Sequence, residues 1–410
     1  MPNAKCVPSM SGRLVVLVFL FFAFFPGISY PQTWEQVNTN GFGDADNYLV
    51  QAMVVFGDRL YVGTYNGDSG VEIWRSSDGE NWIYTNTNDG FGNPNNSSTR
   101  AMAVFDGFIY AGTQNETNGA QLWRSADGGF WQPVFYNGLS SPANSGIWVM
   151  CVFGHRLYAG SGKWTNPSEL WRSADGTAWL PVVNDDGFGD ASNTDILALA
   201  SFNGHLYAGT HNSLNGAQVW RSADGSSWQQ VSTSGFDDDR NWAVWRMAVF
   251  GEHLYAGTGN TQTGGEIWRT SDGTTWTQVN SDGFGDSNNA IISAMAVGGD
   301  RLYAGTARTD LVGAQVWQTD DGMQWTQVNQ NGFGDPQNNA IGSLIAFGGY
   351  LYAGTENGTA LNSAGCEVWR WRLLSERATI PTMSAWGLTA LIGLMGAASL
   401  YCLRRKGAAG

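Results

Sequence analysis

The stretch Leu254-Tyr-Ala-Gly-Thr258 decides the fold, because close variants of it occur seven times along the chain. The copies are spaced by 48 or 49 residues and place a tyrosine at positions 61, 110, 158, 207, 255, 303 and 352. An apolar residue followed by Trp and usually Arg recurs with the same period, and so does a Trp-x-x-Val pattern. A short apolar run precedes each tyrosine. Four short β-prone runs in each period predict one four-stranded sheet per repeat.

The phase of the repeats predicts a closed ring. The first Trp-x-x-Val copy, Trp34-Glu-Gln-Val37, precedes every other run, whereas the last repeat lacks this run after Trp369-Arg370. A strand left over at the start and missing at the end lets the N-terminal strand complete the last blade. The pattern therefore predicts an all-β fold, a seven-bladed β-propeller over residues 31–372 that is closed by strand exchange. An open β-solenoid, the alternative, needs no such phase shift.

Composition supports an ordered, acidic protein. The chain has 410 residues with 55 Gly and 20 Trp, only 14% of its residues are charged, and its net charge is −14. So many aromatic residues exclude a disordered chain, and the negative charge makes nucleic acid a poor partner. Cys151 and Cys366 lie in distant repeats, so we expect two buried small hydrophobic side chains rather than a disulfide framework.

Six repeats share a short turn with an aspartate and a glycine. Ser76-Ser-Asp-Gly79 is the first copy, and each copy is followed by two residues and a Trp. Asp accepts nearby backbone N–H groups and Gly allows a positive φ, so the motif predicts a hairpin turn between the third and fourth strands. The motif resembles the Asp-box of BNR-type repeats, with one residue fewer between Asp and Gly, and the body also resembles kelch-like propellers. The resemblance implies that these aspartates are structural and lie away from the ligand face.

The first 29 residues have the order of a secretory signal peptide. Lys5 and Arg13 precede an apolar run over residues 14–25, and Gly27 and Ser29 then offer small residues for cleavage. This order predicts a signal helix over residues 1–29 that directs export from the cytoplasm.

The C-terminal end predicts a second targeting segment. After a linker over residues 373–379, an apolar stretch over residues 388–403 is followed by a basic cluster at 404–406, as in a transmembrane helix with a cytoplasmic C-terminus. The segment 380–406 resembles the IPTL-CTERM sorting domain of Gram-negative bacteria through Ile380, Pro381, Thr382, Met383, Ser384, Trp386 and Gly387. Met383 replaces the Leu of that motif. The resemblance implies export across the inner membrane, anchoring, a sorting peptidase as partner, and display at the cell surface or secretion. An ordinary membrane anchor is the alternative.

The connections from the fourth strand of one blade to the first strand of the next are rich in oxygen ligands. They repeat as Asn-x-(Asn/Asp)-Gly-Phe-Gly-(Asp/Asn), and their last aspartates are weak candidates for a Ca²⁺ site: Asp44, Asp190, Asp286 and Asp335. The same residue types are ordinary turn formers, so no cofactor is expected.

Residues that break the repeat mark the candidate ligand site. The connections over residues 136–147 and 232–241 depart from the pattern, and both lead into a Trp that no repeat series contains. The candidate residues are Trp148, Trp164, Lys163, Trp242, Trp245, Arg100 and Arg246, with Arg240 close to the same rim. Exposed Trp beside Arg, Asn and Asp is typical of a sugar or peptide site. The alternative is that these Trp side chains fill irregular loop packing.

Three classes of function remain open. A non-enzymatic module would bind a glycan, a peptide or an envelope partner at the loop face. A sialidase- or glycosidase-like hydrolase would need a general acid and a nucleophile or base, and the repeats account for most acids. A scaffold would have no small ligand. The sequence favours the binding module, with no catalytic residues.

Overall fold

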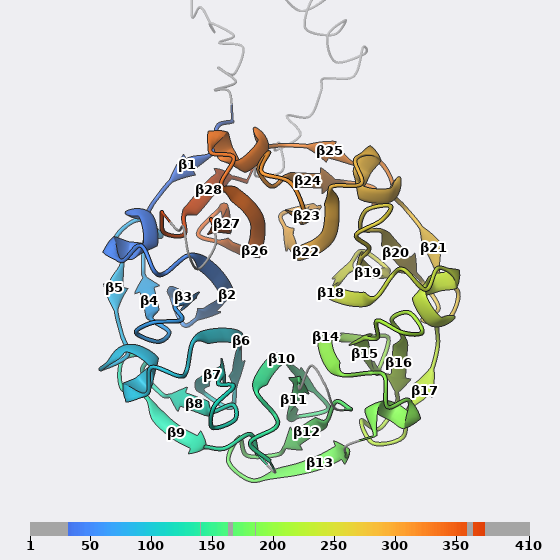
Figure 1. The fold of residues 1–410 in the computed structure, drawn as a ribbon, viewed down its shortest axis with the longest axis horizontal. Helices are drawn as coiled ribbons and strands as arrows, with labels where there is room; N and C mark the ends of the chain where they lie inside the picture. Colours follow the sequence, from blue (N-terminus) through green and yellow to red (C-terminus); the bar gives the residue numbers. More distant parts are fainter. Residues whose placement is uncertain (1–31, 140, 163–166, 185, 359–363, 374–410) are drawn as a thin grey trace, which may run out of the picture. The chain divides into compact units, whose positions relative to one another are not determined.

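The computed structural model describes residues 32–139, 141–162, 167–184, 186–358 and 364–373. These residues form seven four-stranded antiparallel blades arranged around a centre, as Figure 1 shows. The described residues contain strands and six short 3₁₀ turns but no α-helix. The predicted seven-bladed propeller is therefore confirmed.

Each blade contains four strands in order from the centre outward (Figure 1). The first, innermost strands are β2 (Leu49–Phe56), β6 (Ser98–Phe105), β10 (Gly146–Phe153), β14 (Asp195–Phe202), β18 (Ala243–Phe250), β22 (Asn289–Gly298) and β26 (Asn338–Phe347). The second strands are β3 (Arg59–Tyr65), β7 (Phe108–Gln114), β11 (Arg156–Gly162), β15 (His205–His211), β19 (His253–Gly259), β23 (Arg301–Arg308) and β27 (Tyr350–Asn357). We number the blades one to seven in this order.

The two outer strands of each blade are shorter. The third strands are β4 (Ile73–Ser76), β8 (Leu122–Ser125), β12 (Leu170–Ser173), β16 (Val219–Ser222), β20 (Ile267–Thr270), β24 (Val316–Thr319) and β28 (Val368–Arg372). The fourth strands are β5 (Ile83–Tyr84), β9 (Gln132–Phe135), β13 (Trp179–Val183), β17 (Gln229–Gln230), β21 (Thr277–Gln278), β25 (Thr326–Gln327) and, for blade seven, β1 (Glu35–Gln36).

The ring closes through blade seven. Strand β1 pairs with β28 in antiparallel register, with Glu35 opposite Arg370 and Gln36 opposite Trp369. The Arg370 guanidinium donates hydrogen bonds to the carboxylates of Glu35 and Glu80, and so ties this seam to blade one. The predicted strand exchange is confirmed.

Stacked aromatic pairs join neighbouring blades on the side of the 4→1 connections. Six of these connections contain a 3₁₀ turn: η1 (Asn40–Gly43), η2 (Asp89–Gly92), η3 (Gly187–Gly189), η4 (Ser234–Asp237), η5 (Asp282–Gly285) and η6 (Asn331–Gly334). In each turn a Phe with positive φ stacks on the third-strand Trp of the next blade, at 4.3–5.2 Å between ring centroids. Such a φ is unusual for a bulky residue, and the stacking compensates for it.

A buried polar network repeats in all seven blades. One fully buried Asn before or at the start of each first strand donates to a Glu or Gln side chain that also accepts from the third-strand Trp Nε1. The asparagines are Asn47, Asn96, Asn144, Asn193, Asn241, Asn289 and Asn338, and their acceptors are Glu72, Gln121, Glu169, Gln218, Glu266, Gln315 and Glu367. Buried polar groups need such partners, so this network fixes the connections to the blades.

The Asp-Gly turns are hairpins between third and fourth strands, as predicted. In blade one the Asp78 carboxylate accepts the backbone N–H groups of Glu80 and Asn81. The glycines have a packing role too, since a Cβ at Gly128 would lie only 1.8 Å from the Tyr61 hydroxyl of the preceding blade. The same contact between a turn glycine and the recurring tyrosine of the preceding blade is therefore repeated around the ring.

Several sequence predictions are tested only in part. The signal peptide (1–29), nearly all of the linker, the sorting motif and the transmembrane segment (388–403) lie outside the described residues. In the part of the chain that the structure describes, no helix has the length and apolar character of a membrane span.

Both body cysteines are free thiols, but only Cys366 is fully buried, whereas Cys151 is half-buried.

Candidate functional site

A β-bulge interrupts the first strand of every blade at the same register position. In blade two the pairing runs from Thr99↔Thr113 to Ala101↔Gly112 and leaves Arg100 without a partner. The equivalent unpaired residues are Gln51, Arg100, Trp148, Leu197, Trp245, Ser293 and Gly342, which we call the bulge ring. A bulge re-aims its side chain and frees it from the ladder, so the residue type at these positions can differ from blade to blade.

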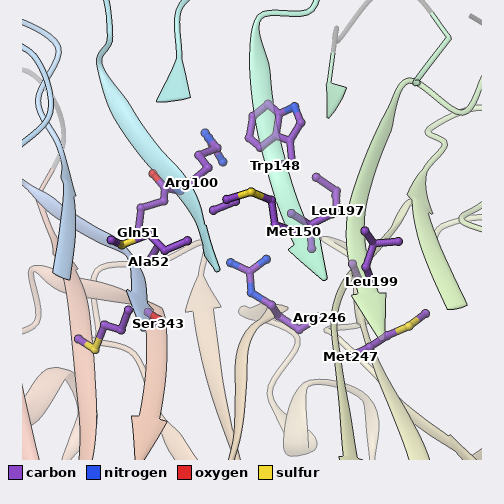
Figure 2. A pocket seen from close by; sticks show the side chains of 15 residues that line it. Gln51, Ala52, Arg100, Trp148, Met150, Leu197, Leu199, Arg246, Met247 and Ser343 are labelled. Atoms are coloured by element: carbon purple, nitrogen blue, oxygen red, sulfur yellow. The ribbon is translucent and has the colours of Figure 1, made fainter. Parts of the chain in front are cut away.

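A cavity of about 180 Å³ lies at the centre of the ring, and the first strands of six blades line it. Figure 2 shows Arg100, Trp148 and Arg246 around this cavity, together with methionine, leucine and alanine side chains. Four bulge-ring residues contribute to its wall, namely Gln51, Arg100, Trp148 and Leu197. The structure thus brings three sequence-predicted site residues to one cavity.

Arg100 connects the cavity to the loop face. Its guanidinium lies 3.7 Å from the centroid of the Trp148 ring, and its Nε donates to Gln114 Oε1 at 2.8 Å. Gln114 in turn donates to Glu116 in the connection between the second and third strands. Burial and the nearby charge of Arg246 lower the pKa of Arg100 to about 9, which leaves it cationic at neutral pH.

Arg246 is the second cation of the cavity. It occupies the position that Ala52, Ala101, Ala198 and Ala294 hold in other blades, directly after the bulge. Its Nη1 donates to the carbonyl of Trp245 at 2.8 Å, and burial lowers its pKa to about 10. A single blade thus contributes an arginine where a methyl group is the rule.

The non-repeat tryptophans form one cluster, but not the exposed surface that the sequence predicted. Trp148 is only 4% exposed and packs with Leu197 and Ala243, with half-buried Trp242 and Trp245 against them. The expectation of an exposed Trp148 is wrong, because the bulge turns it inward and Arg100 covers its face. Trp242 and Trp245 meet edge to face at 5.7 Å.

A buried acid lies beside this cluster. Asp195 is fully buried, and its Oδ2 accepts from Thr194 Oγ1 at 2.8 Å and lies 3.0 Å from His211 Nδ1. The His211 ring also meets Trp242 edge to face. The sequence analysis singled out neither Asp195 nor His211. Their pairing across β14 and β15 could have been found by aligning the repeats, since no other blade has an acid and a histidine there.

Two other sequence-predicted features differ in the structure. Residues 232–241 do not depart from the repeat, because η4 has the same geometry as the other turns and Phe236 stacks on Trp268. Arg240 is exposed and forms a bidentate pair with Asp238 instead of joining the cavity. Lys163 and Trp164 lie outside the described residues.

The calcium candidates hold their own loops together. In Asp44 one carboxylate oxygen accepts the backbone N–H of Asp46 and the other accepts from Asn66. Asp190, Asp286 and Asp335 use both oxygens in the same way. Among the described residues, no three His, Cys, Asp or Glu side chains gather as metal ligands would.

Comparison with known proteins supports the fold alone. No protein-family model matches the sequence, and no curated protein matches it. The WD40 repeats of RRP9 superpose with a TM-score of 0.53 at 13% identity, covering 83% of this chain and 98% of that one. The WD40 propeller domain of Doa1 gives 0.51 at 11% identity, with 83% and 97% covered. An ancestral GH74 enzyme gives 0.55 at 12% identity, and the match covers 79% of this chain but only 48% of the enzyme. The chain is thus a β-propeller similar in fold to WD40 and GH74 proteins.

Proposed function

We propose that the protein is a non-enzymatic binding module whose ligand enters the central cavity from the loop face. The ligand would be a glycan, a peptide or an envelope partner. Propellers commonly serve as binding or interaction modules, because loops and inner strands on a rigid ring tolerate change. The proposal includes export, with residues 1–29 as signal peptide and residues 380–406 as a sorting and anchoring segment.

The observation that carries this proposal is the asymmetry of the bulge ring. A purely structural ring would repeat its inner residues as it repeats its outer Trp and Tyr. Instead, blades two, three and five place Arg100, Trp148 and Trp245 at the bulge, while blades six and seven place Ser293 and Gly342 there. Large charged and aromatic groups therefore gather on one side of a scaffold with sevenfold repetition, as expected for a binding site.

The positions and hydrogen bonds of the Asp and Glu side chains support binding rather than hydrolysis. A glycosidase of the usual kind needs two carboxyl groups on either side of the scissile bond. No Asp or Glu is among the described residues that line the cavity. The repeated aspartates accept backbone N–H groups in their own turns, and Asp195 is buried against Thr194 and His211.

The experiment is a glycan and peptide array probed with the full chain and with Trp245→Ala. Trp245 is half-buried at an unpaired bulge position and packs against the cluster of Trp148 and Leu197, which line the cavity, so its removal should disturb the site more than the fold. Trp325→Ala is the matched control, because Trp325 is also half-buried but lies on the outer side of blade six. We expect binding to be lost with Trp245→Ala and kept with Trp325→Ala.

Three results would contradict the proposal. Equal binding by wild type and Trp245→Ala would place the ligand elsewhere, and no binding by wild type would favour a scaffold. Turnover of chromogenic glycosides by the wild-type protein would establish the hydrolase alternative.

Export is tested separately by protease treatment of intact and permeabilised cells. If the propeller is exported, the protease cleaves it even in cells whose inner membrane is intact.

A further inference from the structure

We infer that Arg100 and Arg246 form a receptor for the carboxylate of a ligand that has a compact apolar body. The inference deepens the proposed function and rests on it, because it assigns a chemical class to the ligand of the same cavity. It follows from the hydrogen bonds that the two guanidinium groups make and from the side chains around them.

Neither arginine has an acidic partner. Among the described residues, no carboxylate oxygen lies within 4.0 Å of the guanidinium of Arg100 or Arg246. Other enclosed arginines differ: Arg308 contacts both Asp286 at 2.8 Å and Asp310 at 2.7 Å, and Arg370 contacts Glu35 and Glu80. The chain has 35 Asp and Glu residues against 21 Lys and Arg, so a lack of acids does not explain the difference.

Most of the donors of both groups remain available. A guanidinium has five N–H donors, and a partly buried cation without a counter-ion is costly. Arg100 uses Nε for Gln114 and rests on Trp148, which leaves both of its Nη groups without a hydrogen-bond partner in the described structure. Arg246 uses Nη1 for the Trp245 carbonyl. A ligand oxyanion between them would satisfy the free donors and the charge together.

The two acids nearby do not fill this role. Asp195 lies close enough for its charge to favour the protonated form of Arg100, but its Oδ2 is taken by Thr194 and His211. Burial raises the pKa of Glu356, and the charge of Arg100 offsets this only in part. Both acids reduce the positive potential around the two arginines, but neither forms an ion pair with a guanidinium group. A bound carboxylate therefore does not have to displace an existing ion-pair partner.

The remaining cavity wall selects the rest of the ligand. Its side chains include the thioethers of Met53, Met102, Met150 and Met247 and the alkyl groups of Leu197 and Leu199. Such groups cannot replace the water around the several oxygens of a phosphate, whereas they pack well against an apolar body. The planar guanidinium matches a carboxylate in two parallel hydrogen bonds, and about 180 Å³ accommodates a small organic acid or the carboxylate-bearing end of a larger ligand.

Isothermal titration of the full chain with benzoate, benzamide and inorganic phosphate tests the inference. Benzamide has nearly the same shape as benzoate but no charge, so we expect it to bind at least tenfold more weakly, and phosphate to bind more weakly as well. Arg246→Gln and Arg100→Gln should each weaken benzoate binding at least tenfold. Arg156→Gln, which changes an exposed arginine at the start of β11, should leave it unchanged.

The possible outcomes separate this inference from the proposed function. Equal binding of benzoate and benzamide would refute the carboxylate receptor, and phosphate binding as tight as benzoate would refute the apolar body. If benzoate does not bind while a Trp245-dependent ligand does, the inference fails and the proposed function stands. If Arg100→Gln does not fold, Arg246→Gln still decides, because four other blades have an alanine at the position of Arg246 and Arg246 has one hydrogen-bond partner.

Discussion

The buried asparagine network permits a matched test of what a charged acceptor contributes to this fold. Asn241 donates to Gly235 O at 2.9 Å and Glu266 Oε2 at 2.7 Å, and its Oδ1 accepts from Thr258 and Asn260. Asn96 makes the same four contacts in blade two, except that its side-chain acceptor is the neutral Gln121. Both asparagines are fully buried. The two sites thus differ chiefly in one charge.

We expect Asn96→Ala to lower the free energy of unfolding by about 3–4 kcal/mol, because it removes four buried hydrogen bonds of about 1 kcal/mol each. Asn241→Ala should cost about 1 kcal/mol more, because a hydrogen bond to a charged group contributes about 1.5–3 kcal/mol. Glu266 would then keep only the Trp268 Nε1 donor at 2.7 Å among its described side-chain contacts. Urea denaturation of both variants and wild type, followed by tryptophan fluorescence, measures the difference.

The pH dependence of that difference identifies its cause. Burial raises the pKa of Glu266 above its ordinary 4.5, so its contribution to stability is fully present below 4.5 and is lost as pH rises through the folded-state value. Loss of the Asn241 donor raises this pKa further. The additional cost of Asn241→Ala should therefore appear at neutral pH and vanish below 4.5. An equal cost for the two variants at neutral pH, or an additional cost that persists in acid, would refute this reasoning.

Two further predictions concern the Asp-Gly turns. Gly128→Ala should destabilise the protein by about 1–3 kcal/mol more than Gly107→Ala, because both have positive φ but only the first brings a Cβ within 1.8 Å of the Tyr61 hydroxyl; equal urea midpoints would contradict the proposed interblade contact. Hydrogen bonds from the backbone N–H groups of Phe130 and Gly129 lower the pKa of Asp127 to about 2, so its stabilising effect is present above the usual 3.8 and is lost as pH falls towards 2. Asp127→Asn should flatten the acid limb of the stability curve, and a limb as steep as in wild type would contradict this reasoning.

The fold could be predicted from the sequence because its information is local and repeated. Four runs per period define the blade, and the displaced run at Trp34 specifies the closing strand. The Asp-Gly turn could be predicted for the same reason, since its hydrogen bonds join residues two and three positions apart. The partner of Phe42 could not, because Trp74 lies in the next blade and only the ring brings the two together.

The site was predicted less well, because its geometry depends on the bulge. Repeat breaking drew attention to Arg100, Trp148, Trp245 and Arg246, and three of them do line one cavity. Period-two alternation does not reveal an unpaired residue, so the inward turn of Trp148 was missed and its exposure was predicted wrongly. Alignment of the repeats would show the bulge as a position of the first strand where residue type changes from blade to blade.

The closure of the ring at blade seven has a mechanical consequence. The described chain enters the ring at β1 and leaves it at β28, and two residue pairs join these strands. Tension applied to both ends would load these two pairs and the Glu35–Arg370 ion pair before any other blade carries force. Tension applied through one end alone acts on only one of the two seam strands, β1 or β28, and the other strand carries no load. The number of attachment points, rather than the strength of the blades, would then decide whether the propeller stays closed under load.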